Sequence, residues 1–186
     1  MRFKSSYIIF SAPSGGGKTT IVRQLQQKYE ETAISVSATT RPKRNNEVHG
    51  RDYFFLSRQE FEKAIQQDRF LEYEQVHGNY YGTLKETVEN MSARGQVVLF
   101  DIDVNGALSI KQQFPKAISL FIKPPSKEEL IRRLQRRQSE RESDIRKRLQ
   151  RLDYEYARSE HFDHIIINDQ LSETINQVES LIIKTE

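Results

Sequence analysis

The sequence predicts an α/β protein of three layers, α/β/α, in which a central parallel sheet lies between two layers of helices. Short apolar runs rich in β-branched residues alternate along the chain with amphipathic stretches of helical length, and this alternation is typical of buried parallel strands joined by helices. At 186 residues the chain has the length of one compact unit with small insertions. We therefore expect one main core that carries a small β-rich lobe and a helical lid.

The candidate strands of the central sheet are short apolar runs bounded by polar or small residues. They are "YIIFS" (7–11), "AISVSA" (33–38), "QVVLFD" (96–101), "AISLFI" (117–122) and "HIIIN" (164–168). The candidate helices of the core and the lid lie at 18–30, 84–94, 104–113, 126–138, 141–159 and 172–184. Acidic residues gather at the start of the fifth helix, where negative charge stabilises a helix N-terminus.

Residues 37–83 break this alternation. They hold short aromatic-rich segments separated by polar turns, with one helix candidate at 57–68, and this pattern is typical of a small β-rich insertion. We divide the chain accordingly into a core (1–36, 84–125 and 159–186), an inserted lobe (37–83), and a lid segment with adjoining helices (126–158).

The positive charge of the chain is concentrated in the lid segment. The net charge is +3, and Ser126–Arg158 alone carries eleven Lys/Arg against seven Asp/Glu, so the remaining residues sum to −1. The two signs are interleaved and no aromatic platform accompanies the arginines, which favours a solvated helix or a local anion site over a nucleic-acid surface.

Composition excludes several other classes of protein. With no cysteine, the chain has no disulfide and no thiolate metal site, and the pair His161 and His164 is typical of residues that flank a strand. No apolar run approaches the ~18 residues of a membrane span, and the N-terminal run is too short for a signal peptide. We expect a cytoplasmic protein with no membrane partner, and leave open whether it is a monomer or a homo-oligomer.

The stretch "SAPSGGGKTT" (11–20) lies between a predicted strand and a predicted helix, and is expected to bind phosphate. It matches the P-loop pattern G-x-x-x-x-G-K-[ST] from Ala12 to Thr19 except at its first position. Glycines let successive N–H groups point at phosphate oxygens, Lys18 reaches the outer phosphates, and the Thr19 hydroxyl suits Mg²⁺. The residues expected around the ATP phosphates are Ala12, Pro13, Ser14, Gly15, Gly16, Gly17, Lys18, Thr19 and Thr20. Because alanine replaces the first glycine, we expect a negative φ at Ala12.

A carboxylate follows the predicted strand at 96–101. Asp101 ends that strand, where an acidic side chain suits the Mg²⁺ of a P-loop nucleotide. The next residues, "DVNG" (103–106), fit the D-x-x-G pattern of a GTPase switch. No N-K-x-D motif for guanine follows, so a kinase with a small acceptor is the favoured class and a regulatory NTPase is the rival.

The inserted lobe carries the side chains that such an acceptor would need. Arg41 and Arg44 lie three apart, and a guanidinium binds phosphate oxygens in a bidentate manner. Tyrosine hydroxyls nearby in the sequence could complete a second phosphate site. Guanine presents N–H donors, which suit carboxylates such as Glu72 and Asp103, whereas adenine offers a lone pair at the same position.

These motifs together resemble the guanylate kinase family, whose members convert ATP and GMP to ADP and GDP. The matching segments cover nearly the whole chain and include Ser37–Arg44, Gly50–Phe55, Phe70–Glu72, Tyr80–Thr83 and Asp101–Gly106. The resemblance implies that the GMP phosphate is held by Ser37, Arg41, Arg44, Tyr53 and Tyr81. It further implies that Glu72, Thr83 and Asp103 recognise guanine, and that Asp101 serves the metal.

The resemblance also identifies lid arginines that bridge the donor and acceptor phosphates. Arg133 and Arg137 share a helix face, and Arg148 lies on the next helix. The expected catalytic residues are Lys18, Arg44, Arg137 and Arg148, which stabilise charge on the transferring phosphoryl group. Arg132, Arg136 and Arg146 are expected in solvated ion pairs.

Two features of the chain complicate this comparison. Family members usually place R-G-T after the lid helix, whereas this chain has "RRQSE", so the effect of the missing glycine on the lid and the exact partner of Arg137 stay open. Asn168, at the end of the last strand, is either an adenine contact within the ATP site or an ordinary turn residue.

The expected reaction is transfer of the γ-phosphoryl group of ATP to GMP, and to dGMP as well, with Mg²⁺ and without a covalent enzyme intermediate. We expect the lobe and the lid to close on the substrates, because an open site would admit water. The rivals are a peptide-binding adaptor of guanylate-kinase-like fold, which would lack a working P-loop, and a kinase for sugar phosphates, which would leave Glu72 and Asp103 without a base.

Overall fold

A five-stranded parallel sheet forms the centre of the molecule. This computed structural model describes residues 2–76, 78–136 and 142–184. The strands lie in the order β2 (Thr32–Ser35), β7 (Val97–Asp101), β1 (Tyr7–Ser11), β8 (Ile118–Lys123) and β9 (His164–Ile167), and all neighbours are parallel. The apolar runs of the sequence are therefore buried strands, as parallel sheets require.

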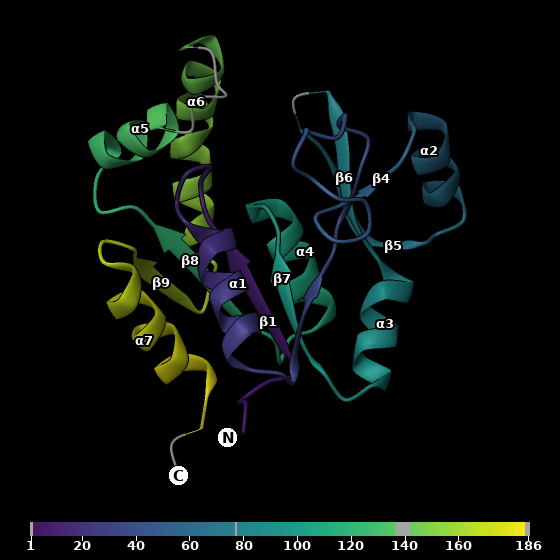
Figure 1. Cartoon of the computed structure of the whole chain (residues 1–186), viewed down its shortest axis with the longest axis horizontal. Coiled ribbons are helices and arrows are strands. Elements are labelled where there is room, and N and C mark those ends of the chain that lie inside the picture. Colours follow the sequence, from purple (N-terminus) through teal and green to yellow (C-terminus); the bar gives the residue numbers. More distant parts are fainter. Residues whose placement is uncertain (1, 77, 137–141, 185–186) are drawn as a thin grey trace.

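Helices cover both faces of this sheet (Figure 1). Four of them are α1 (Lys18–Lys28), α3 (Lys85–Ala93), α4 (Val104–Gln113) and α7 (Leu171–Ile182). Successive residues of a strand point to opposite faces, so Ile8 and Phe10 pack with α1 and α7 while Ile9 packs with α3 and α4. The predicted three-layer α/β/α fold is confirmed.

The inserted segment forms a second, mixed sheet. Its order is β4 (Phe54–Phe55), β3 (Ala38–Thr39), β6 (Asn79–Leu84) and β5 (Phe70–Val76). Helix α2 (Arg58–Gln66) packs on it through Phe61 and begins at Ser57, which forms a capping box with Glu60. This lobe stands to one side of the central sheet (Figure 1).

One predicted strand is wrong at its end. The run at 33–38 is not a single strand, because β2 ends at Ser35 and Ala38 already belongs to the second sheet, where it pairs with Phe54 and Gly82. Both pieces are apolar and buried, so their hydrophobic pattern is continuous although the chain passes from one sheet to the other between them.

Two helices stand on the opposite side of the molecule from the second sheet (Figure 1). They are α5 (Lys127–Arg136) and α6 (Glu142–Ser159). Leu130, Leu134 and Leu152 join them in a small apolar cluster of their own. The carboxyl ends of β1, β7, β8 and β9 meet at one edge of the central sheet, between these helices and the second sheet, and ligand sites of open α/β sheets form at this edge.

Candidate functional site

The loop after β1 has the geometry of a phosphate cradle. Gly17 is the N-cap of α1 with φ of 96°, and the backbone N–H of Gly16 donates to the Pro13 carbonyl at 2.8 Å. A Cβ on Gly16 would come within 2.9 Å of the Ala12 Cβ, so this close turn requires glycine. Among the described non-glycine residues only Asp68 has a positive φ, so the negative φ expected at Ala12 is confirmed.

Lys18 is held at the base of this loop by the end of β7. Its Nζ donates to the Ile102 carbonyl at 2.7 Å and pairs with Asp101 Oδ1 at 2.7 Å. Both side chains are less than one-fifth exposed. The fold therefore brings the predicted phosphate-binding lysine and the predicted metal-binding carboxylate into direct contact.

An open pocket of about 300 Å³ lies over the loop. It is lined by residues 12–20 and by Asp101 and Asp103 from the edge of the central sheet. Tyr53 and Tyr81 line it from the second sheet, and helix α6 contributes two residues, Arg151 and Glu155. All nine loop residues expected around ATP phosphates thus face one cavity.

A second pocket of about 180 Å³ adjoins the first on the side of the inserted lobe. Ser37, Glu72, Tyr53, Tyr81 and Asp103 are among its lining residues. Lys18, Asp101 and Asp103 line both pockets. The two cavities therefore share a wall that carries the lysine and both carboxylates.

Glu72 is the deepest charged group of the smaller pocket. It is 9% exposed, and its Oε1 accepts from the hydroxyl of buried Thr83 at 2.6 Å. Burial raises the pKa of Glu72 to about 7, and the nearby Asp103 adds to that rise. A Cβ on Gly106 would lie 2.7 Å from Glu72 Oε2, so α4 can approach this carboxyl only because residue 106 is glycine.

Asp103 is fixed by helix α4. Its Oδ1 accepts from the backbone N–H groups of Asn105 and Gly106 at 2.9 and 3.2 Å, which makes it the N-cap of the helix. The "DVNG" segment is thus a strand-to-helix turn that carries one carboxylate into the pocket.

Tyr53 and Tyr81 line both pockets and pack edge to face, with ring centroids 6.2 Å apart. Burial first, and then the charge of Asp101, raises the pKa of Tyr53 to about 12, so its phenol remains a hydrogen-bond donor at neutral pH. Tyr80 points elsewhere, because it stacks on Phe61 in the core of the lobe. Of the tyrosines at 80 and 81, only Tyr81 lies in the site.

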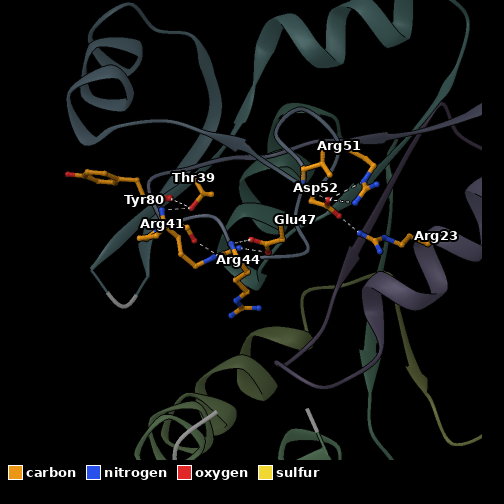
Figure 2. A network of polar contacts seen from close by, with 10 residues as sticks. Arg23, Thr39, Arg41, Arg44, Glu47, Arg51, Asp52 and Tyr80 are labelled. Atoms are coloured by element: carbon orange, nitrogen blue, oxygen red, sulfur yellow. Dashed lines mark hydrogen bonds and ion pairs between the residues drawn. The ribbon is translucent and has the colours of Figure 1, made fainter. Parts of the chain in front are cut away.

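The two arginines of the loop after β3 are tied to Glu47 (Figure 2). Arg41 Nη2 donates to Glu47 Oε1 at 2.6 Å, and the backbone N–H of Arg44 donates to Oε2 at 2.8 Å. The guanidinium of Arg44 is directed away from this carboxylate in Figure 2. Neither arginine lines the two pockets, but the Arg41 guanidinium lies 5.4 Å from the ring centroid of Tyr53, which lines both of them.

The same loop is anchored to α1. Asp52 accepts from Arg51 and Arg23, the latter at 2.7 Å, and also from the Val48 backbone N–H (Figure 2). Arg23 lies one turn into the helix that begins at the phosphate cradle, so this ion pair links the inserted lobe to that helix. The backbone N–H of Val48 first, and the arginines after it, hold the pKa of Asp52 below its ordinary value.

The expected lid arginines are described only in part. Arg133 donates from Nε to Glu129 at 2.9 Å and from Nη2 to the Asn168 carbonyl at 2.9 Å. Arg137 and the side chain of Arg148 lie outside the described residues. Arg132 forms an exposed ion pair with Glu129, as expected; the side chains of Arg136 and Arg146 lie outside the described residues.

Helix α6 contributes a polar cluster that the sequence reasoning missed. Arg151 donates to Glu74 Oε1 at 3.1 Å and pairs with Glu155 at 3.5 Å. Asn105 also donates to Glu74, at 2.9 Å, and accepts from the hydroxyl of Tyr154 at 2.8 Å. Burial raises the pKa of Glu155 to about 7 against the lowering effect of Arg151. The i,i+4 spacing of Arg151 and Glu155 was the available signal, but their contact with β5 is visible only in the fold.

Two negative findings apply to the parts of the chain that the structure describes. No group of three or more His, Asp or Glu side chains is arranged to hold a metal ion within residues 2–76, 78–136 and 142–184. None of the described helices has both the length and the apolar character that a membrane crossing requires.

Comparison with known proteins identifies the family. The family model for guanylate kinase matches residues 4–185. A guanylate kinase of Chlorobium chlorochromatii is 45% identical over 177 residues, which are 95% of this chain and 93% of the relative. A guanylate kinase of Rickettsia bellii is 43% identical over 97% of this chain and 95% of its own length.

Solved structures agree with the sequence relatives. The crystal structure of guanylate kinase from Anaplasma phagocytophilum matches with a TM-score of 0.75 at 29% identity, over 94% of this chain and 82% of that one. A shikimate kinase from Bacteroides thetaiotaomicron, at 13% identity and a TM-score of 0.52, shares the fold. Because the family model covers nearly every residue, and the two relatives above 40% identity match over more than nine-tenths of both chains, this chain belongs to the guanylate kinase family.

Proposed function

We propose that this chain transfers the γ-phosphoryl group of ATP to GMP, giving ADP and GDP, and that it accepts dGMP as well. The observation that carries the proposal is the shared wall of two adjoining pockets, one over the P-loop and one over Glu72, with Lys18 and Asp101 between them. A donor and an acceptor held on either side of this wall have their phosphates facing each other, and such positioning is the main requirement of phosphoryl transfer.

The larger pocket is the donor site in this proposal. Backbone N–H groups of the non-proline residues among 12–20 surround the ATP phosphates, and the N-terminus of α1 favours their negative charge. Lys18 exchanges part of its contact with Asp101 for the outer phosphates. Arg133 lies near the same site through Asn168 and is assigned to ATP binding.

The smaller pocket is the acceptor site. Glu72 and Asp103 accept from the N–H donors of guanine, and the hydroxyl of Thr83 holds the Glu72 carboxyl in position. The acceptor phosphate is assigned to Ser37, Tyr53, Tyr81, Arg41 and Arg44. Arg41 already lies beside Tyr53, whereas for Arg44 this assignment requires the guanidinium to turn toward the pocket when GMP enters.

The donor set suits Mg²⁺. Thr19 offers an exposed hydroxyl and Asp101 a carboxylate in the same pocket, and hard oxygen ligands of this kind bind Mg²⁺ together with nucleotide phosphates. When bound, Mg²⁺ neutralises phosphate charge and orients the phosphate oxygens. Thr19 and Asp101 are the residues that would hold it.

Catalysis in this scheme is electrostatic. Lys18, Arg44, Arg137 and Arg148 stabilise charge as it develops on the transferring group, and no side chain needs to form a covalent bond. The cation Arg44 comes from the inserted lobe (37–83), and Arg137 and Arg148 come from the lid segment (126–158), so both parts must close over the core to assemble the site. Small nucleotides are the partners, and the cytoplasm is the proposed location.

The acceptor series tests this function. ADP release from ATP is measured in a coupled assay with GMP, dGMP, AMP, CMP and UMP supplied in turn. We expect turnover with GMP and dGMP and turnover lower by ~10⁴ with AMP, because adenine presents a lone pair to buried carboxylates. Equal rates with all five acceptors would reject the assignment of guanine to Glu72 and Asp103.

A further inference from the structure

Asn168 lies at a junction of four elements behind the phosphate-binding loop. Its backbone N–H donates to the Lys123 carbonyl of β8 at 2.7 Å, and its carbonyl accepts from Arg133 of α5 at 2.9 Å. The side chain Nδ2 donates to the Gly16 carbonyl at 2.9 Å, and Oδ1 accepts from Thr174 of α7 at 3.1 Å. The residue is only 5% exposed.

The contact with the loop is close enough to restrict the neighbouring residue. A Cβ on Gly17 would lie 2.2 Å from Asn168 Nδ2, so the amide packs directly against the peptide that joins Gly16 to Gly17. That peptide lies between two glycines, which have the largest conformational freedom of any residues. Without a partner on its carbonyl, it could rotate between alternative orientations.

The orientation of this peptide decides where a phosphate donor points. In a trans peptide the C=O and N–H groups lie on opposite sides of the plane, and the structure describes no cis peptide. Because the Gly16 carbonyl is held toward Asn168, the N–H of Gly17 points to the opposite side. Gly17 lines the pocket over the loop, and its N–H is one of the donors that a phosphate would meet there.

We propose that Asn168 is a positioning residue for the phosphate-binding loop, which locks the Gly16–Gly17 peptide in the orientation that presents the Gly17 N–H to the donor phosphates. Thr174 acts on the same lock, because its hydroxyl is shared between Oδ1 at 3.1 Å and the Gln170 carbonyl at 2.9 Å, and its contact with Oδ1 supports the rotamer that turns Nδ2 toward Gly16. The role differs from an adenine contact, since it concerns the phosphates and is independent of the base. It rests on the proposed donor site, although not on GMP being the acceptor.

The test compares ligands that share phosphates and differ in the base. Binding of Mg-ATP, Mg-tripolyphosphate and GMP is measured by calorimetry for the wild-type chain, Asn168→Asp and Thr174→Val. The first variant keeps the side-chain shape and replaces the N–H donor by an oxygen. The second variant leaves Asn168 intact, and it tests the same contact even if the first variant does not fold.

We expect Asn168→Asp to lower the binding affinities for ATP and for tripolyphosphate by the same factor, about tenfold or more, because the Gly16 carbonyl loses its hydrogen-bond donor. Thr174→Val should weaken both by a smaller common factor. GMP binding should not change, and in turnover KM for ATP should rise while KM for GMP stays constant. Asn90→Asp on α3 makes the same charge change at an exposed position outside both pockets, and should have no effect.

Three results would overturn the proposal. If the variants bind ATP more weakly but tripolyphosphate as well as the wild type does, Asn168 contacts adenine. If no affinity changes, Asn168 has no positioning role. If the affinity for GMP falls as much as that for ATP, the substitution has damaged the fold in general. The wild-type assay with GMP separates this inference from the proposed function. If the wild-type chain fails to phosphorylate GMP, yet Asn168→Asp lowers its affinity for tripolyphosphate, the proposed function is rejected and the positioning role of Asn168 is retained.

Discussion

Replacing Glu72 by glutamine should stabilise the protein without nucleotide while removing its ability to bind GMP. Glu72 is 9% exposed, and burial raises its pKa from an ordinary value of 4.5 to about 7. The folded chain therefore favours the neutral carboxyl, whereas the proposed function needs the carboxylate to accept from guanine. Glutamine keeps the neutral shape and an oxygen for the Thr83 hydroxyl, but presents an amide donor to the guanine donors.

The size of the effect follows from the pKa difference. A pKa of about 7 in the folded chain and 4.5 in the unfolded chain differ by about two and a half pH units, and each unit corresponds to about 1.4 kcal/mol. Since the folded pKa is the higher one, this contribution to stability is fully present below pH 4.5 and is lost as pH rises through 7. At pH 8 the ionised Glu72 thus lowers the free energy of unfolding of the wild type by about 3 kcal/mol, and Glu72→Gln does not carry this penalty.

Urea unfolding followed by circular dichroism between pH 5 and pH 8.5 measures the difference. We expect the free energy of unfolding of Glu72→Gln to exceed that of the wild type by about 3 kcal/mol at pH 8 and by much less near pH 5. Glu30→Gln, at an exposed glutamate on the surface, should change it by less than ~0.5 kcal/mol at any pH. A variant no more stable than wild type at pH 8, or a difference independent of pH, would refute the reasoning.

Four further predictions concern the loop, the acceptor phosphate and closure. Lys18→Ala should lower kcat by orders of magnitude in a coupled assay with little change in GMP affinity; near-normal turnover would exclude its role. Gly17→Ala should weaken ATP binding beyond its effect on stability, because the new Cβ meets Asn168, whereas Gly95→Ala, at φ of 73° with nothing within 4 Å, should cost only about 1 kcal/mol of stability and leave ATP binding intact. Tyr53→Phe should raise the Kd for GMP about tenfold in calorimetry and leave that for guanosine unchanged, since the phenol is assigned to the phosphate; a loss for guanosine as well would contradict this. X-ray scattering should show compaction when both nucleotides are added, and unchanged dimensions would argue against closure.

Local patterns predicted the parts of the site that lie in continuous segments. The P-loop, the strand-end carboxylate Asp101 and the buried strands follow from glycine content, hydrophobic runs and spacing, and the structure places them together as expected. The prediction was wrong where one apolar run was divided between two sheets. Burial pattern alone does not distinguish them, because β2 and β3 are both buried.

Contacts that depend on the shape of a loop or on the packing of distant segments could not be predicted in the same way. The ion pair between Arg41 and Glu47 depends on the shape of one loop. The ion pair between Arg151 and Glu74 depends on how α6 lies against the second sheet. Asn168 is the clearest case. An asparagine after a strand is common in turns, and only the three-dimensional arrangement shows its amide on the Gly16 carbonyl, 152 residues away in the chain.

The central claim is that the γ-phosphoryl group of ATP passes directly to GMP across the wall between the two pockets. Its most direct test is to follow the label from ATP carrying ³²P in the γ position, with GMP and Mg²⁺ present. We predict that the label appears in the β-phosphate of GDP in step with ADP release. Label found in inorganic phosphate, with GMP unchanged, would contradict the account.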